Sequence, residues 1–192
     1  TMNAPTASRR PTRRDLHGES FTDDYAWLRD RTDSETIAYL EAENEFTEES
    51  LAHLSDLREA IFEEIRSRVL EDDISAPARR GDWWYASETA EGSQYPTLIR
   101  MKGSPDGERH VTLDVNALAE GHEYTQLGTY NVSPSQRYVL YSVDHDGSES
   151  YQLRIRDLET GADLEDRVEG TYYSTAWSSD EAYVFYTTVD SA

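Results

Sequence analysis

The sequence has no cysteine among its 192 residues. This absence excludes disulfide bonds, thiolate catalysis and zinc sites with cysteine ligands, and it is compatible with a reducing compartment. No run of 18 apolar residues occurs, which excludes a membrane-spanning helix. No apolar signal core follows the N-terminal arginines, so we expect a cytoplasmic rather than a secreted protein.

Basic residues are scarce, and lysine is almost missing. The chain has 18 basic residues, of which only Lys102 is a lysine, against 39 acidic ones, and its formal net charge is -21. Nucleic acid and anionic membranes would be repelled by such a protein, whereas cationic substrates would be attracted. The composition fits salt adaptation as well as a GC-rich genome. With 13 Tyr, 4 Trp and 4 Phe, the chain is too aromatic for a disordered acidic tail.

The motifs of several enzyme classes are also missing. The sequence contains no G-x-S-x-G elbow, no H-E-x-x-H pair, no P-loop and no dinucleotide-binding glycine pattern. The loop at residues 144–147 resembles the start of a calcium loop but lacks its later ligands. We therefore assign no catalytic, cofactor-binding or metal-binding residue and expect no cofactor. Structural or exposed roles are expected for the five histidines: His17, His53, His110, His122 and His145.

Residues 1–16 are rich in Pro, Thr, Ser and Arg, which is typical of a flexible arm. Four arginines of this arm, at positions 9, 10, 13 and 14, suggest either a small basic patch or, as we expect, a solvated tail. Aromatic residues are then concentrated beside charges between Phe21 and Arg31. We expect Tyr25, Trp27 and Leu28 to anchor this segment by packing.

Residues 17–74 carry two helical patterns. Thr32 and Glu35 have the spacing of a capping box, which predicts Thr32 as the N-cap of a first helix. Its face repeats at three and four residues: Ile37, Leu40 and Asn44. A second helix has a clearer apolar stripe, with Phe62 beside it, and the stripe consists of Leu54, Leu57, Ile61, Ile65 and Val69. Such a stripe would be unstable in water, so we expect a partner to cover it.

The pattern changes to strands after a boundary at residues 71–82, where Pro77 and Gly81 interrupt the chain. We therefore expect a separate sheet domain over residues 75–192. The predicted strands cover residues 83–87, 95–101, 109–113, 138–143, 151–157 and 183–188, with a further outer strand at residues 162–168. Turn signals such as Asp146-Gly147 and Thr160-Gly161 separate them.

An internal repeat is the most informative feature of this domain. The segment from Ser133 to Tyr141 recurs from Ser178 to Tyr186, and Ser, Tyr, Val and Tyr match at a constant offset of 45. A four-stranded propeller blade has roughly this length. Residues 75–192 hold about 2.6 such periods, whereas propellers close with about four to eight blades. We therefore expect an incomplete β-propeller of about two and a half blades, belonging to a longer protein.

An ordered series of short motifs runs along the chain. It begins with the run from Asp24 to Asp30, preceded by His17 and Gly18, and continues with the run from Tyr39 to Asn44. Further segments of the series are residues 92–95, 113–116, 121–122, 127–128, 151–161 and 185–187. In this series the sequence resembles the oligopeptidase B branch of the prolyl oligopeptidase family of serine peptidases, from about residue 17 to residue 190.

The resemblance implies an α+β fragment: an N-terminal helical segment of an α/β-hydrolase domain, followed by the first two to three blades of a seven-bladed propeller. It implies an enzyme that cleaves short peptides after Arg or Lys, in which the propeller restricts access. The catalytic triad would lie in the C-terminal hydrolase part, so the 192-residue chain alone is expected to be inactive. Ser133 and Ser178 would be turn residues.

Two other interpretations remain open at this point. The chain could be a truncated, non-catalytic propeller that binds a partner or self-associates through its open strand edges. A natural stop codon after Ala192 would favour that interpretation, and a continuing reading frame would favour the peptidase. Alternatively, the chain is an acidic domain of mixed α and β structure whose resemblance is accidental.

Overall fold

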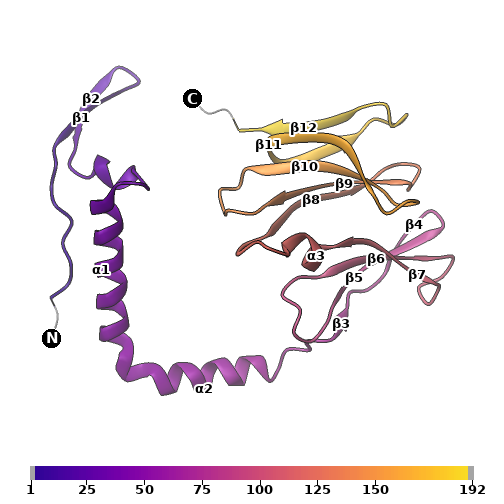
Figure 1. Ribbon diagram of the computed structural model, residues 1–192, viewed down its shortest axis with the longest axis horizontal. Coiled ribbons are helices and arrows are strands. Elements are labelled where there is room, and N and C mark those ends of the chain that lie inside the picture. Colours follow the sequence, from indigo (N-terminus) through magenta and orange to yellow (C-terminus); the bar gives the residue numbers. More distant parts are fainter. Residues whose placement is uncertain (1–2, 190–192) are drawn as a thin grey trace. The chain divides into compact units, whose positions relative to one another are not determined.

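The chain folds into two compact units, which divide between Val69 and Leu70. The computed structural model describes residues 3–189 (Figure 1). The division lies before the position expected from composition, because residues 73–74 already form a strand of the second unit. No helix in the described range has the length and apolarity needed to cross a membrane.

The first unit opens with an antiparallel hairpin of β1 (Thr12–Leu16) and β2 (Glu19–Asp23). The prediction of a flexible arm is therefore wrong for residues 12–16. The side chains of Arg9 and Arg13 remain 75% exposed, as expected for solvated arginines. All four arginines nevertheless lie beside carboxylates: Arg9 with Asp24, Arg10 with Glu35, Arg13 with Asp15, and Arg14 with Asp23. They form no free basic patch, because each positive charge has an acidic neighbour.

A short 3-10 turn, η1 (Ala26–Arg29), connects this hairpin to the helix α1 (Ser34–Leu51). Trp27 anchors the turn: its indole Nε1 donates to the Ser8 carbonyl oxygen at 2.9 Å, and the Arg10 guanidinium lies 4.4 Å from its ring centroid. The N-cap of α1 is Asp33, whose carboxylate accepts from the Glu35 backbone N–H, and not Thr32 as predicted. Thr32 instead bonds to Asp30.

Helix α1 ends in a second 3-10 turn, η2 (Ala52–Leu54), and the chain continues directly into α2 (Ser55–Arg66). Figure 1 shows that α2 leaves α1 in a new direction. The predicted second helix is therefore confirmed, but Leu54 precedes it and Val69 lies beyond its end, so the stripe on the helix itself consists of Leu57, Ile61 and Ile65, with Phe62 beside them.

The second unit begins with an antiparallel sheet in which β3 and β4 both pair with β5, at opposite ends. Together, β3 and β4 therefore form one edge strand that is interrupted near Pro77, and the sheet is four strands wide. Its strands are β3 (Asp73–Ile74), β4 (Ala78–Arg80), β5 (Trp83–Thr89), β6 (Thr97–Lys102) and β7 (Arg109–Asp114). The helix α3 (Val115–Ala119), which the sequence did not predict, follows.

The next sheet has the order β12-β11-β10-β9-β8. Its strands are β8 (Gln126–Val132), β9 (Tyr138–Asp144), β10 (Tyr151–Asp157), β11 (Asp163–Trp177) and β12 (Val184–Thr188). The long strand β11 pairs with β10 through its first half and with β12 through its second half, with Gly170 at positive φ between them. Its first half is thus the fourth strand of one meander and its second half starts the next, which matches the 45-residue period.

The repeated segment forms the same turn twice. In both copies the serine hydroxyl accepts from the backbone N–H five residues later, Ser133 from Tyr138 and Ser178 from Tyr183. Gln136 and Glu181 both adopt positive φ. Gly81 has the same conformation two residues before β5, so the structure contains a third copy that side-chain identity does not reveal. The prediction that both serines are turn residues is confirmed.

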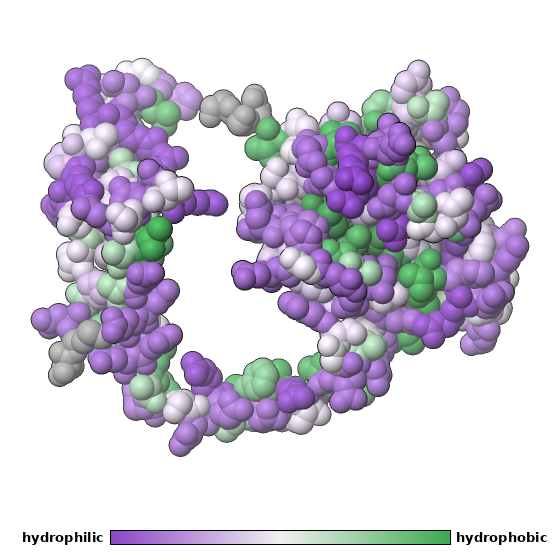
Figure 2. All heavy atoms as spheres, in the orientation of Figure 1, coloured by the Kyte–Doolittle hydropathy of each residue, from purple (hydrophilic) through white to green (hydrophobic). Residues whose placement is uncertain are grey.

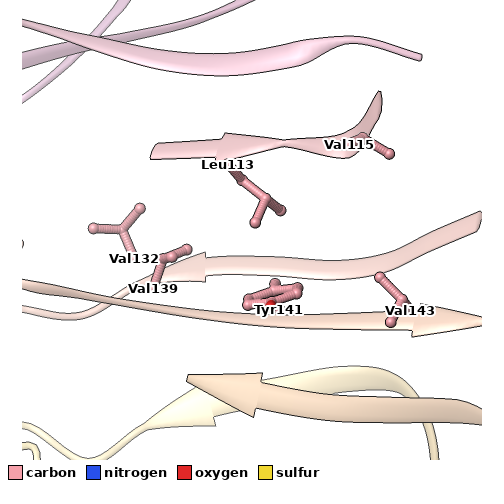
Figure 3. Packing of buried hydrophobic residues seen from close by; sticks show 6 residues of the cluster. All are labelled: Leu113, Val115, Val132, Val139, Tyr141 and Val143. Carbon is pink, nitrogen blue, oxygen red and sulfur yellow. The ribbon is translucent and has the colours of Figure 1, made fainter. Parts of the chain in front are cut away.

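The core of the second unit lies between the two sheets. Figure 3 shows Leu113 and Val115 facing Val132, Val139, Tyr141 and Val143, and all six are at most 4% exposed. Two side chains of the first sheet also reach the turn between β8 and β9: Tyr85 donates its hydroxyl to the Gln136 side chain, and Arg100 donates to the Gln136 carbonyl oxygen. The two sheets are therefore joined both by apolar packing and by side-chain hydrogen bonds. Within the second sheet, Glu181 accepts from the backbone and hydroxyl of Ser135 and so connects its two repeated turns.

Candidate docking surfaces

The apolar face of α2 is uncovered within the first unit. Its side chains are about half exposed or more: Leu57 57%, Ile61 48%, Phe62 56% and Ile65 61%. Figure 2 shows apolar side chains at the surface along this helix. Burying one such side chain stabilises a protein by about 1.5–3 kcal/mol. The structure thus agrees with the expectation that this stripe needs a partner.

A second uncovered surface lies at β12. Positions of the repeat that are 45 residues apart have opposite environments: Leu140 and Tyr141 are fully buried, whereas Phe185 is 61% and Tyr186 is 45% exposed. Within the described residues, β12 has a neighbouring strand on one side only. A cavity of about 290 Å³ lies between β12 and the strands β9 and β10. The repeat therefore indicates that Phe185 and Tyr186 occupy positions that are buried when a neighbouring element covers them.

The histidines form no catalytic arrangement with the serines singled out by the sequence. His122, from the connection before β8, stacks on His145, from the turn after β9, with ring centroids 3.6 Å apart and ring planes at 11°. His145 Nδ1 lies 2.9 Å from the Thr125 hydroxyl oxygen. His110 contacts the edge of Trp83. These contacts agree with structural roles for the three rings.

The aspartates that resemble a calcium loop close a turn instead. Asp144 is 1% exposed, and its carboxylate accepts backbone N–H groups of Asp146, Gly147 and Glu149. Both carboxylate oxygens are thus used within the chain. Over residues 3–189, no group of three or more His, Asp or Glu side chains is placed to hold a metal ion.

The stacked histidine pair predicts a pH effect on stability. Burial of the ring, and then the neighbouring His122, lower the pKa of His145 below its ordinary value, although Asp144 acts in the opposite direction. The unfolded chain therefore takes up a proton at a higher pH than the folded chain, and stability is lost as the pH falls below about 6.5. We expect a His145→Asn variant to lose less thermal stability than the natural protein between pH 7.5 and 5.5.

The control for this measurement is His53→Asn, which changes an exposed histidine on η2 and should keep the natural pH dependence. Parallel melting curves for the natural protein and both variants would contradict the assigned role of the pair.

Sequence reasoning found the α2 stripe, because a helical period marks it. It did not find the pairing of His122 with His145, since two separate loops bring these rings together. The open surface at β12 could have been found from the repeat, because the positions aligned with Leu140 and Tyr141 share their apolar character.

Comparisons with known proteins agree with this architecture. A family model for the prolyl oligopeptidase N-terminal beta-propeller domain matches residues 5–192. Protease 2 of Moraxella lacunata is 35% identical, with 98% of this chain and 28% of the relative covered. Dipeptidyl aminopeptidase BI of Pseudoxanthomonas mexicana is 36% identical, with 91% of this chain and 26% of the relative covered.

Solved structures give the same result. Oligopeptidase B from Leishmania major superposes with a TM-score of 0.87 at 28% identity, covering 99% of this chain and 29% of that one. Oligopeptidase B from Trypanosoma brucei, with covalently bound antipain in a closed form, gives a TM-score of 0.86 at 31% identity, covering 98% and 29%. The chain thus spans less than a third of the length of each of these relatives.

Proposed function

The chain belongs to the prolyl oligopeptidase family and represents part of its N-terminal portion, and from this premise we propose that it is the front part of an oligopeptidase B-like serine endopeptidase. The whole enzyme would cleave short peptides after Arg or Lys. The match to oligopeptidase B structures over nearly the entire chain, at TM-scores of 0.87 and 0.86, carries this proposal. A prolyl endopeptidase structure superposes less closely, at 0.78.

The helical unit would pack on the catalytic α/β-hydrolase domain of the same polypeptide. Its apolar stripe on α2 supports this role, because four large side chains there are exposed with no partner among the described residues. The oppositely placed Glu59 and Glu63 would remain in water. Burial of the stripe would connect this unit to the rest of the enzyme without contributing a reacting group.

The sheets of the second unit would be the first blades of a seven-bladed propeller that limits access to the active site. The exposed positions Phe185 and Tyr186 support continuation of the sheet, because their equivalents Leu140 and Tyr141 are fully buried. A closed ring of rigid blades would exclude folded proteins and admit short peptides. The net charge of -21 would favour approach of cationic peptides.

The peptide-cleavage reaction would be carried out by residues outside this segment. Acyl transfer by a Ser-His-Asp triad needs a nucleophile, a base hydrogen-bonded to it and a group that orients the base. In the described residues, Ser133 and Ser178 both use their hydroxyls in turns, and His122 and His145 stack on each other. We therefore propose that this chain positions and filters substrate and contributes no catalytic residue.

The test is an assay of the full-length natural protein with a fluorogenic arginyl peptide and a matched prolyl peptide. We expect cleavage of the arginyl peptide, loss of that cleavage with a serine-directed inhibitor, and at least about tenfold lower activity on the prolyl peptide. Preference for the prolyl peptide would reassign the specificity. Absence of any inhibitor-sensitive cleavage would favour the alternative, a non-catalytic binding or oligomerisation module.

A further inference from the structure

A cavity of about 380 Å³ opens between β4 of the first sheet and β8 of the second, and its walls carry an unusual charge for this protein. Arg79 and Arg80 line it from β4, and Tyr130 and Val132 line it from β8. None of the residues that line it is acidic, although acidic residues outnumber basic ones by 39 to 18 in the whole chain. The cavity is therefore a locally cationic site in an acidic molecule.

The cavity lies among the first strands of successive blades. These strands approach one another across blade boundaries: Thr129 on β8 bonds to Thr175 in the second half of β11, and the Trp177 indole donates to the Asn131 carbonyl oxygen. In a propeller the blades are arranged around a central channel, so one edge strand of each blade faces that channel. The first strands β8 and the second half of β11 are edge strands that contact each other across their boundary, so we assign the first strands to the channel side. Residues of β4 and β8 would then line the inner wall, where a peptide in the channel would pass.

Strand register places two arginines, Arg80 and Arg100, together with Lys102 on the face of the first sheet that turns toward β8. Arg80 lies opposite Trp83, and Arg100 lies opposite Tyr85. Because Trp83 and Tyr85 are two residues apart on β5, all four side chains share one face. This is the face of Tyr85, which packs against the core between the sheets and also lines the cavity.

Neither Arg80 nor Arg100 is paired with a carboxylate in the described part of the chain. Arg100 is 6% exposed; its guanidinium stacks over Trp83 at 3.9 Å and donates to the Gln136 carbonyl oxygen, while its Nε has no hydrogen-bond partner in this range. No ion pair or side-chain hydrogen bond of Arg80 is found there either. Arg80 lines the cavity, so an anion bound there would meet a positive charge that no carboxylate of the described residues neutralises.

The remaining walls fit an amino-acid residue rather than a bare oxyanion. Val132 and the rings of Tyr85 and Tyr130 supply apolar surface. Tyr130 is neutral at physiological pH, as tyrosine ordinarily is, and burial raises its pKa further, to about 12, despite the opposing effects of the Thr112 hydrogen bond and of the Arg100 and Arg80 charges. Its hydroxyl lies 2.6 Å from that of Thr112. If the side chain of a C-terminal residue packed on these surfaces, the terminal carboxylate of that residue would lie beside Arg80.

We propose that this cavity binds the C-terminal residue of a peptide, with the terminal carboxylate at Arg80 and the side chain against Tyr85, Tyr130 and Val132. The inference rests on the proposed peptidase function, which it deepens: the channel wall would select substrates by the position of their free carboxyl end. Cationic peptides would thus be attracted by the acidic surface as a whole and held at one end by a local cationic site.

The test compares free-acid and amidated peptides in the full-length protein and an Arg80→Gln variant. Because the path from the cleaved bond to the cavity is not fixed by this chain, the peptides carry two to about twelve residues after the cleaved Arg, at about 3.3 Å each. For peptides within one range of lengths, we expect the natural protein to have a lower KM for the free acid than for the amide. The variant should raise the KM for that peptide about tenfold, leave kcat unchanged and alter the amide less than about twofold.

Two further variants make the result specific. Arg80→Lys keeps the charge and should restore much of the acid preference. Arg167→Gln removes an exposed arginine from β11, away from the cavity, and should leave both KM values unchanged. Equal KM values for acid and amide peptides at every length, in natural protein and variant alike, would overturn the inference while leaving the peptidase function intact.

A failure of the proposed peptidase function would give different results. If neither peptide is cleaved, binding of the acid and amide forms is measured by calorimetry, and acid-selective binding that Arg80→Gln abolishes would still support the site. Inhibition by inorganic phosphate that Arg80→Gln removes, without any acid-over-amide preference, would assign the cavity to a free anion and overturn the peptide assignment.

Discussion

Replacing Tyr141 by alanine is expected to lower the free energy of unfolding by about 3–5 kcal/mol, the usual range for removing a large ring from a core. Tyr141 is fully buried between the two sheets (Figure 3), where it packs with Leu113 and Val139. Its hydroxyl also donates to Asp163 at 2.6 Å. The loss would leave a cavity in the contact that joins successive blades, and rigid strands on both sides limit its collapse.

The measurement is the urea midpoint and the melting temperature of the natural protein and the variant. Tyr141→Phe serves as the control, because it keeps the ring and removes only the hydrogen bond to Asp163, at a cost of about 1–3 kcal/mol. A loss for Tyr141→Ala no larger than that for Tyr141→Phe would mean that the ring does not stabilise the contact between the sheets.

If the proposed packing of the helical unit holds, introducing a charge into the α2 stripe is expected to have a large effect on the full-length protein and almost none on this segment. Ile61→Glu in the full-length protein would lose about 2 kcal/mol of apolar burial and, in addition, force a carboxylate out of water. We expect a lower melting temperature and loss of most peptidase activity. In the 192-residue chain, Ile61 is 48% exposed, so the same change should alter stability by less than about 0.5 kcal/mol.

Ala60→Glu is the matched control, since it adds the same charge one residue away from the stripe, at an exposed position of the same helix. It should leave both the melting temperature and the activity of the full-length protein near their natural values. Equal effects of the two substitutions would show that the stripe is not covered in the enzyme, and the proposed packing of the helical unit would have to be abandoned.

Local signals in the sequence predicted the elements whose residues carry a clear period. The α2 stripe and the strand β10 were found this way, and the 45-residue repeat gave the blade length. The N-cap of α1 was placed one residue too early, because Thr32 and Asp33 are both good caps and only the backbone conformation selects Asp33. The strand β1 was missed, because its residues are mostly polar and it pairs with β2 through the backbone and one cross-strand ion pair, Arg14 with Asp23, rather than through an apolar face.

The sequence by itself determined that this chain is acidic and cysteine-free, with a helical segment followed by repeated antiparallel strands, and its motifs indicated the family. These properties depend on composition and on short-range periodicity, which the chain carries locally. Only the tertiary structure decided that Arg80 and Arg100 share one face beside Tyr130, that His122 stacks on His145, and that Gly81 repeats the turn of Gln136. Each of these depends on strand register and on contacts between residues far apart in sequence, which no local pattern encodes.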